Sequence, residues 1–183
     1  MTNPWMRTYS GRRIHLLEPR PEQIDVVDIA HALSNTCRFA GHVPAFYSVA
    51  QHSIVVADLV SDEAPFWGLL HDASEAYLHD LTRPLKESLP AYRKAERRMM
   101  AAICERFGLP PQMPRAVRRA DNIALATEFR DLYGESIPNC IAWSKGAQPM
   151  ESTIRPVCPE VAKDLFLVRY EKLSGDPAGG RTA

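Results

Sequence analysis

The chain has 183 residues, of which 45% are hydrophobic and 24% charged, a composition typical of one globular domain. Its 22 basic and 22 acidic residues cancel, so no global positive field exists to hold nucleic acid, and a small-molecule ligand is the better expectation. No apolar run approaches the length of about 18 residues that predicts a transmembrane helix, so no membrane partner is expected.

The cysteines are widely spaced and form no CxxC pair. The N-terminal segment lacks the apolar core of a secretory leader. These features favour reduced thiols in a cytoplasmic protein. The four cysteines are Cys37, Cys104, Cys140 and Cys158.

The first predicted element is a short β-hairpin over residues 6–17. Its arms, MRTY and RRIHLL, flank the turn dipeptide Ser10–Gly11.

Helical periodicity follows the hairpin. Asp25 or Asp28 is expected to cap a first helix, and a second is expected over residues 49–60. A third is predicted to begin after Ser61, where acidic residues suit the positive end of a helix dipole, and to continue to about His79. The expected apolar positions are Ile29, Ala32 and Leu33 in the first helix, Ile54, Val55 and Leu59 in the second, and Trp67, Leu70, Ala73 and Tyr77 in the third.

The second half of the chain predicts further helices. Pro84 and Pro90 bracket a single-turn helix, a longer helix over 91–107 stops at Gly108, and another spans about 114–133 and ends at Gly134. A loop-rich stretch over 135–159 precedes a final helix over 160–173 and a disordered tail over 174–183. We therefore expect one mostly α domain over residues 1–173.

The strongest chemical signal is the adjacent pair His71–Asp72. Together they offer an imidazole nitrogen and a carboxylate oxygen to one ion, a mixed ligation that suits a divalent transition metal. A pair alone is weak support, because His79–Asp80 repeats it nearby.

Two further residues strengthen the prediction of a metal site. His52 lies among apolar residues in SVAQHSIVVADL, and Asp121 precedes an apolar helical stripe in RRADNIALATEF. Taken singly, His52 reads as a core histidine bonded to a carbonyl, and Asp121 as a surface acid. Burying either without a partner is costly, and one shared ion satisfies both together with the pair.

The order H…HD…D resembles the HD-domain phosphohydrolases. It is most similar to the bacterial 5′-deoxynucleotidases and the phage deoxynucleotide (dATP) triphosphohydrolases. The resemblance covers about residues 35–128, in the motifs SVAQHS, GLLHDASEAYLHDLTRPLK and ADNIALATE. It implies an all-helical HD fold and one divalent cation (Mn, Co, Zn, Ni, Fe or Mg). The implied metal ligands are His52, His71, Asp72 and Asp121.

Two acids are the candidate catalytic groups. Glu75 follows the pair at a spacing that shares its face in a continuous helix, and an acid beside a metal can accept a proton from attacking water. In the resembled family this HDxxE position carries an active-site acid. The segment from Asp80 to Lys86 resembles the family's D-L-P-T-P-V-K, which implies a place for Asp80 near phosphate and nucleoside. Thr82 and Arg83 depart from that pattern, which leaves substrate preference open.

The candidate substrate contacts centre on Arg38. The deoxynucleotidases have an arginine followed by an aromatic residue at a similar distance before the first histidine, and that arginine contacts phosphate. Phe39 stands here in place of the usual Trp. The further candidates are Asn35, His42 and Lys86. Arg115, Arg118 and Arg119, just before Asp121, are interpreted as surface residues.

The resulting hypothesis is metal-dependent hydrolysis of a phosphate ester of a (deoxy)nucleotide. The first expectation is a 5′-deoxynucleotidase, which converts a deoxynucleoside monophosphate to a nucleoside and phosphate. The alternative is a deoxynucleoside triphosphate triphosphohydrolase that releases tripolyphosphate, and Arg83 mildly favours it. A noncatalytic metal-containing nucleotide sensor is a rival from another class. The resemblance also implies a homo-oligomer, dimeric or higher.

Overall fold

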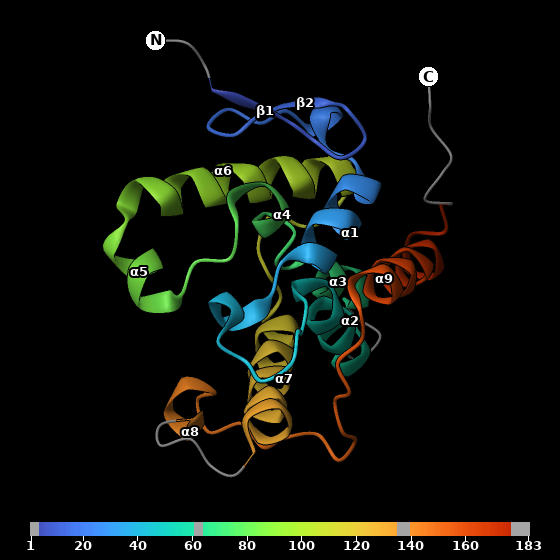
Figure 1. Cartoon of the computed structure of the whole chain (residues 1–183). Helices are drawn as coiled ribbons and strands as arrows, with labels where there is room; N and C mark the ends of the chain where they lie inside the picture. The colour runs from blue at the N-terminus through green and yellow to red at the C-terminus, as the bar shows by residue number, and fades with distance from the viewer. Residues whose placement is uncertain (1–3, 61–63, 135–139, 177–183) are drawn as a thin grey trace.

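The computed structural model describes residues 4–60, 64–134 and 140–176. The fold is mostly α, as the sequence predicts, and 61% of the described residues are helical and 5% are in strands. Figure 1 shows the N-terminal hairpin lying along α6 and α1, while α7 extends away from them toward α8. Within the described residues, none of the helices has the length and apolar character needed to span a lipid bilayer.

The predicted hairpin is confirmed. Strand β1 (Trp5–Arg7) pairs antiparallel with β2 (Arg13–His15), and Met6 faces Ile14 in the register. At the turn Gly11 adopts a φ of 87°, which a residue with a Cβ rarely tolerates.

The two candidate caps of the first helix have different roles. Asp25 caps α1 (Val26–Asn35) by accepting a hydrogen bond from the Val27 amide at 2.8 Å. Asp28 is buried instead, and its carboxylate accepts hydrogen bonds from the Ser10 amide and hydroxyl at 2.6 and 2.8 Å. The hairpin turn is therefore fastened to α1.

Helix α2 (Val49–Leu59) begins at the cap residue Ser48 and lies at the centre of the molecule, against α3, α7 and α9. The three apolar positions named from the sequence pack against the core clusters. Ile54, Val55 and Leu59 are only partly buried, since the small residues of α2 face its neighbours and allow close packing. The fully buried positions are Val49, Ala50, His52, Ser53, Val56 and Ala57.

The predicted third helix is broken in two, and this is a correction. Helix α3 (Pro65–Leu70) ends before the His–Asp pair, and α4 (Glu75–Leu78) begins after it. Between them the amide of Ala73 donates to the Leu70 carbonyl, and that of Glu75 to the Asp72 carbonyl, both three residues back. The carbonyl of Gly68, which a continuous helix would pair with a backbone amide, is bonded by the His71 imidazole at 2.7 Å. The expected start, at residues 61–63, lies outside the described residues.

The later helices follow the predictions closely. Gly108 caps the C-terminus of α6 with a φ of 65°, and residues 144–158 have no regular helix or strand. The short α8 was not expected. Residues 177–183, which belong to the predicted disordered tail, lie outside the described part. The bounds are α5 Arg83–Ser88, α6 Pro90–Phe107, α7 Arg115–Tyr133, α8 Cys140–Trp143 and α9 Pro159–Ser174, with single 3-10 turns η1 Pro21–Gln23 and η2 Arg38–Gly41.

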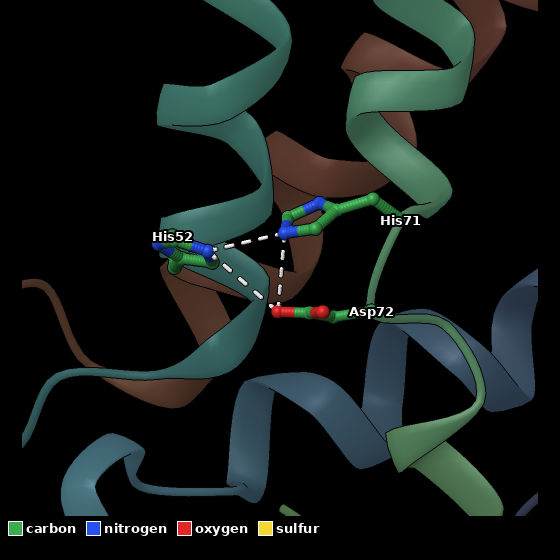
Figure 2. A group of neighbouring side chains, drawn as sticks. All are labelled: His52, His71 and Asp72. Atoms are coloured by element: carbon green, nitrogen blue, oxygen red, sulfur yellow. Dashed lines mark hydrogen bonds and ion pairs between the residues drawn. The ribbon is translucent and has the colours of Figure 1, made fainter. Parts of the chain in front are cut away.

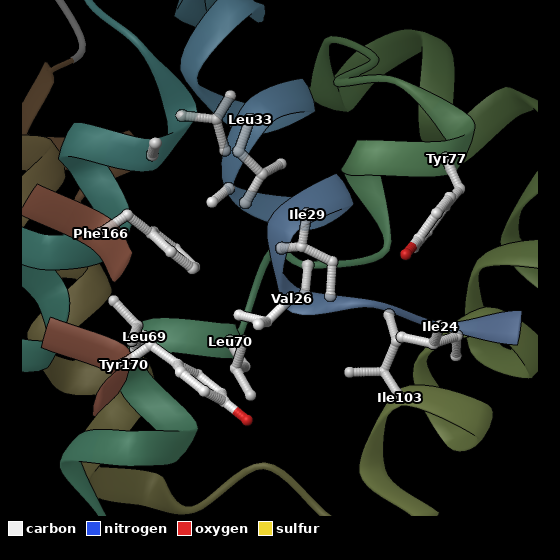
Figure 3. Packing of buried hydrophobic residues seen from close by; sticks show 14 of the residues in the cluster. Ile24, Val26, Ile29, Leu33, Leu69, Leu70, Tyr77, Ile103, Phe166 and Tyr170 are labelled. Atoms are coloured by element: carbon white, nitrogen blue, oxygen red, sulfur yellow. The ribbon is translucent and has the colours of Figure 1, made fainter. Parts of the chain in front are cut away.

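The main core forms where α1, α3 and α9 meet, with α6 and β2 closing it (Figure 3). Burial of large apolar side chains here is the main stabilising contribution, at about 25 cal/mol for each Å² removed from water. Its fully buried members include Ile14, Ile29, Leu33, Leu69, Leu70, Ile103 and Phe166. Cys37, Cys104 and Cys158, the cysteines whose side chains are described, carry free thiols.

Candidate metal centre

The four predicted metal ligands come from three segments, and three of them, His52, His71 and Asp72, form one group that could hold a metal ion, with Asp121 next to His52. His52 projects from the middle of α2, His71 and Asp72 from the turn after α3, and Asp121 from α7. Figure 2 shows the first three side chains pointing toward one another. Nε2 of His52 lies 3.2 Å from Nε2 of His71, 3.6 Å from Oδ2 of Asp72 and 3.3 Å from Oδ1 of Asp121. The Nε2 atom of His71 lies 3.2 Å from the same Asp72 oxygen.

The outer nitrogens of both imidazoles are already engaged. Nδ1 of His71 lies 2.7 Å from the Gly68 carbonyl, which only accepts, so this nitrogen carries the hydrogen. Nδ1 of His52 lies 2.6 Å from Oε1 of Glu128. Burial opposes the charge of Glu128, but Arg38 and His52 outweigh it and hold the pKa of this carboxyl below its usual range, so Nδ1 of His52 is also a donor. Both Nε2 lone pairs therefore point into the cluster.

Two lone pairs 3.2 Å apart repel unless a cation lies between them. Burial and the charge of Arg38 act to lower the pKa of His52, but Glu128 and Asp121 raise it to about 9. In the metal-free protein a proton therefore supplies that positive charge at neutral pH. A divalent metal ion can replace the proton, because two imidazole nitrogens and carboxylate oxygens form a ligand set that such ions prefer. The group His52, His71 and Asp72 can thus hold a metal ion.

The two carboxylates are the most exposed part of the cluster. The His52 side chain is fully buried, whereas those of Asp72 and Asp121 are 23% and 37% exposed. Burial would raise the pKa of Asp72, but the neighbouring histidines and Arg38 lower it on balance. Both carboxylates are thus charged and accessible from solvent, which leaves one side of the cluster open to water or a ligand.

Glu128 is a buried partner of the cluster that the sequence did not single out. It is fully buried and bonds His52 through one carboxylate oxygen and Arg38 through the other, at 3.0 Å to Nη2 and 3.3 Å to Nε. Its signal was present, because Glu128 lies two helical turns after Asp121 on α7 and therefore on the same face. An acid at that spacing, inside an apolar stripe, predicts a buried partner for a cation.

Arg38 lies beside the cluster in a strained turn. Its Nη1 is 3.8 Å from Oδ2 of Asp72, and its side chain is 12% exposed. Burial opposes its charge, but Glu128 and Asp72 raise the pKa of the guanidinium above its usual value. The next two residues, Phe39 and Ala40, have left-handed φ values of 55° and 52°, which costs roughly 1–2 kcal/mol each. Such strain persists where packing fixes it, and here it accompanies the placement of Arg38.

Glu75 and Lys86 form a second polar group near the metal cluster. Glu75 is buried, with Oε1 3.5 Å from Nζ of Lys86, which also binds Glu96 at 2.6 Å. Within the described chain, Oε2 of Glu75 has no hydrogen-bond partner. Burial and the charges of Asp72 and Asp80 raise the pKa of Glu75 well above its usual value. The expected proximity of Glu75 to Asp72 therefore holds, although a helix break replaces the continuous helix.

The remaining candidates lie outside this cluster. The Phe39 ring packs against Phe129 and Tyr133, with centroids 5.7 and 5.5 Å apart. Asn35, at the end of α1, is exposed and bonds the His31 carbonyl through its own amide. His42 is exposed, and its carbonyl accepts a hydrogen bond from the Tyr133 hydroxyl.

Comparison with known proteins places the chain in a family. It is 41% identical over 173 residues to "Uncharacterized protein YfdR" of Escherichia coli (strain K12), and the alignment covers 93% of this chain and 96% of the relative. The chain belongs to the family of YfdR. It is also 37% identical over 150 residues to "Uncharacterized protein RCAP_rcc00048" of Rhodobacter capsulatus, covering 74% of this chain and 76% of that one. No family model matches the chain.

Proposed function

We propose that this protein is a divalent-metal-dependent phosphohydrolase of the HD type that acts on (deoxy)nucleotides. One observation carries the proposal: two histidine Nε2 atoms, both oriented by hydrogen bonds at Nδ1, meet the carboxylates of Asp72 and Asp121 on the open side of the cluster. A divalent cation held by these four residues would polarise a phosphoryl oxygen and lower the pKa of water. The set of nitrogen and oxygen donors suits Mn, Co, Zn, Ni, Fe or Mg.

Arg38 is the proposed phosphate-binding residue. Two of its nitrogens bond Glu128, while Nη1 points toward Asp72 at the edge of the cluster. A guanidinium fixed in this way offers its remaining N–H groups to a phosphoryl oxygen with little further loss of freedom. It would offset the charge that develops on the phosphoryl group during hydrolysis.

Glu75 is the proposed general base. Its pKa is raised from the usual value in the direction of neutral pH. A general base accepts a proton from water most effectively when its pKa lies near the pH of the reaction. Its unpartnered Oε2 is the atom available to receive that proton. Asp80, whose charge acts on Glu75, is proposed to orient the sugar or to protonate the leaving oxygen. Lys86 holds Glu75 from the other side, at 3.5 Å.

The preferred substrate in this proposal is a deoxynucleoside 5′-monophosphate, with triphosphates as the alternative. The test incubates purified protein with Mn²⁺, Co²⁺ or Mg²⁺ and deoxynucleoside mono-, di- and triphosphates, and separates the products by ion exchange. Nucleoside with orthophosphate from monophosphates would support the nucleotidase, and nucleoside with tripolyphosphate would support the triphosphohydrolase. No turnover by protein that binds metal would favour the nucleotide sensor.

The metal itself is tested with Asp72→Ala. This change removes a partly exposed carboxylate, so the helical fold should persist while metal binding and turnover are lost. Glu105→Ala, on the exposed face of α6, is the control and should leave both unchanged. A fully active, metal-free Asp72→Ala protein would contradict the proposal.

A further inference from the structure

A pocket of about 370 Å³ lies between α7 and the segment that follows α8. One wall is formed by α7, and the other by residues 144–147. Its lining includes Arg115, Arg118, Arg119, Asn122, Lys145 and Gly146. Four of these side chains are cationic, and none of the described residues that line the pocket is acidic.

The α7 wall is a regular helical stripe. Positions 115, 118, 119 and 122 follow the spacing that places side chains on one face of a helix. Asn122 directly follows the proposed metal ligand Asp121, so the pocket and the metal cluster use neighbouring faces of the same helix. The arginines that the sequence assigned to the surface are therefore gathered in one concavity along α7.

Among the described residues, none neutralises the cations of the pocket. Within the described part of the chain, Arg115, Arg118, Arg119 and Lys145 make no ion pair and no side-chain hydrogen bond, and all four are exposed. Like charges gathered in a concave site repel one another and concentrate a positive potential there. Such a site attracts an anion that carries several charges.

The opposite wall has an unusual backbone. Lys145 has a left-handed φ of 55° and Gly146 one of 77°, and the Ala147 amide closes the turn on the Ser144 carbonyl at 3.1 Å. A non-glycine residue rarely adopts this conformation, and such strain clusters at ligand-binding sites. The turn sets Lys145 opposite the arginine stripe.

We propose that this pocket binds a polyphosphate group. Guanidinium forks bind phosphate oxygens in pairs, and several unpaired cations match a chain of phosphates better than a single one. If the proposed function holds in its triphosphohydrolase form, on which this step rests, the group is the phosphate tail of a nucleoside triphosphate held at the metal centre. A free polyphosphate that binds independently of turnover shares the same chemistry.

The first experiment titrates inorganic tripolyphosphate into the chelator-treated full chain by calorimetry, so that the result is independent of metal and turnover. The test variant is Arg119→Gln/Lys145→Gln. The control is Arg97→Gln, on the exposed face of α6. We expect the dissociation constant for tripolyphosphate to rise at least tenfold in the double variant and to stay unchanged in the control. Both variants should unfold at the wild-type temperature. Absence of binding to the wild-type chain, or equal weakening by Arg97→Gln, would overturn the proposal.

A second experiment identifies the source of the polyphosphate. If the pocket holds the tail of the substrate, the double variant should raise KM for dATP about tenfold and leave KM for dAMP unchanged. If it holds a free polyphosphate, both KM values should stay unchanged while tripolyphosphate binding is lost. Either result supports the binding of a polyphosphate group in this pocket. A wild-type chain that binds tripolyphosphate but hydrolyses no nucleotide would refute the proposed function and leave the pocket standing.

Discussion

Glu128 and His52 share a buried hydrogen bond of 2.6 Å, and neither side chain is exposed to solvent. The second oxygen of the same carboxylate bonds Arg38 at 3.0 Å. One carboxylate thus fixes the tautomer of a proposed metal ligand and the position of a proposed phosphate-binding residue. Partners of this kind, which orient ligands without contacting the metal, commonly account for roughly 10- to 100-fold in metal affinity.

Replacing Glu128 with Gln should therefore weaken both metal binding and the fold. The amide cannot balance the charge of Arg38 and no longer fixes the hydrogen on Nδ1 of His52. We expect Mn²⁺ affinity to fall by roughly 10- to 100-fold and the free energy of unfolding by about 3–5 kcal/mol. Calorimetric titration and urea unfolding measure the two effects. Glu105→Gln is the exposed control, and an unchanged Mn²⁺ affinity in Glu128→Gln would show that Glu128 does not orient the ligand.

Bound metal should stabilise the folded chain. An ion that binds only the folded state adds about 2.7 kcal/mol at roughly a hundred times its dissociation constant. For a domain of this size, that corresponds to an increase in Tm of about 5–10 °C. Thermal unfolding with Mn²⁺ and then with excess EDTA measures the shift. The Asp72→Ala variant should show no shift, and an equal shift in that variant would place the stabilising ion elsewhere.

The elements that the sequence predicted best are those whose signals are local. The hairpin, the Gly108 stop of α6 and the Asp25 cap of α1 each depend on a few neighbouring residues, and the structure confirms them. The break between α3 and α4 was missed because it coincides with a side-chain bond from His71 to the Gly68 carbonyl, which apolar periodicity does not reveal.

The group His52, His71 and Asp72, which could hold a metal ion, was predictable from the sequence, whereas the residue that orients it was not. His52, His71, Asp72 and Asp121 could be named, because an imidazole or a carboxylate within an apolar stripe needs a partner. Glu128 was missed because one glutamate in a charged helix resembles a solvated residue until the fold buries it. The cationic pocket was missed for a similar reason, since Lys145 reaches the α7 arginines only through the turn after α8.

Metal affinity should rise with pH up to about 9. The pKa of His52 in the metal-free protein is raised to about 9, so below that pH a proton must leave before a metal ion can bind. For each pH unit below 9, the proton on His52 should therefore lower the affinity for metal about tenfold. The charged and titratable groups that face His52 are Glu128 and Asp121 on α7, His71 and Asp72 after α3, and Arg38 in η2. Calorimetry at about pH 7 in buffers of different ionisation enthalpy counts the released protons, and a count of zero would contradict the prediction.

Glu75→Gln should separate turnover from stability. Because the pKa of Glu75 is raised in the folded chain, its contribution to stability is greatest below its unfolded pKa and is lost as pH rises toward the folded pKa. The amide of Gln does not ionise, so the variant does not lose stability as pH rises. The metal-free variant should therefore be at least as stable as the wild type at neutral pH. Turnover should fall by about 10²- to 10⁴-fold with metal binding retained. Glu87→Gln on α5 is the exposed control, and full activity in Glu75→Gln would assign the base elsewhere.

Gly68 sets the distance between the two histidine-bearing segments. A Cβ at this position would lie 3.0 Å from Cα and 3.3 Å from the amide nitrogen of Ala57 on α2. Gly68→Ala must therefore push α3 away from α2 and carry His71 away from His52. We expect a loss of roughly 1–3 kcal/mol in unfolding free energy from overpacking, together with weaker Mn²⁺ binding.

Helix propensity acts in the opposite direction at Gly68, since alanine favours a helix over glycine by about 1 kcal/mol. The exposed reverse change Ala101→Gly on α6 measures that contribution in this chain, so that it can be subtracted from the Gly68→Ala result. A Gly68→Ala protein that is more stable than the wild type and binds Mn²⁺ equally well would mean that the two helices can separate without disturbing the cluster. A less stable protein with weakened metal binding would instead show that the α2–α3 contact maintains the spacing of His52 and His71.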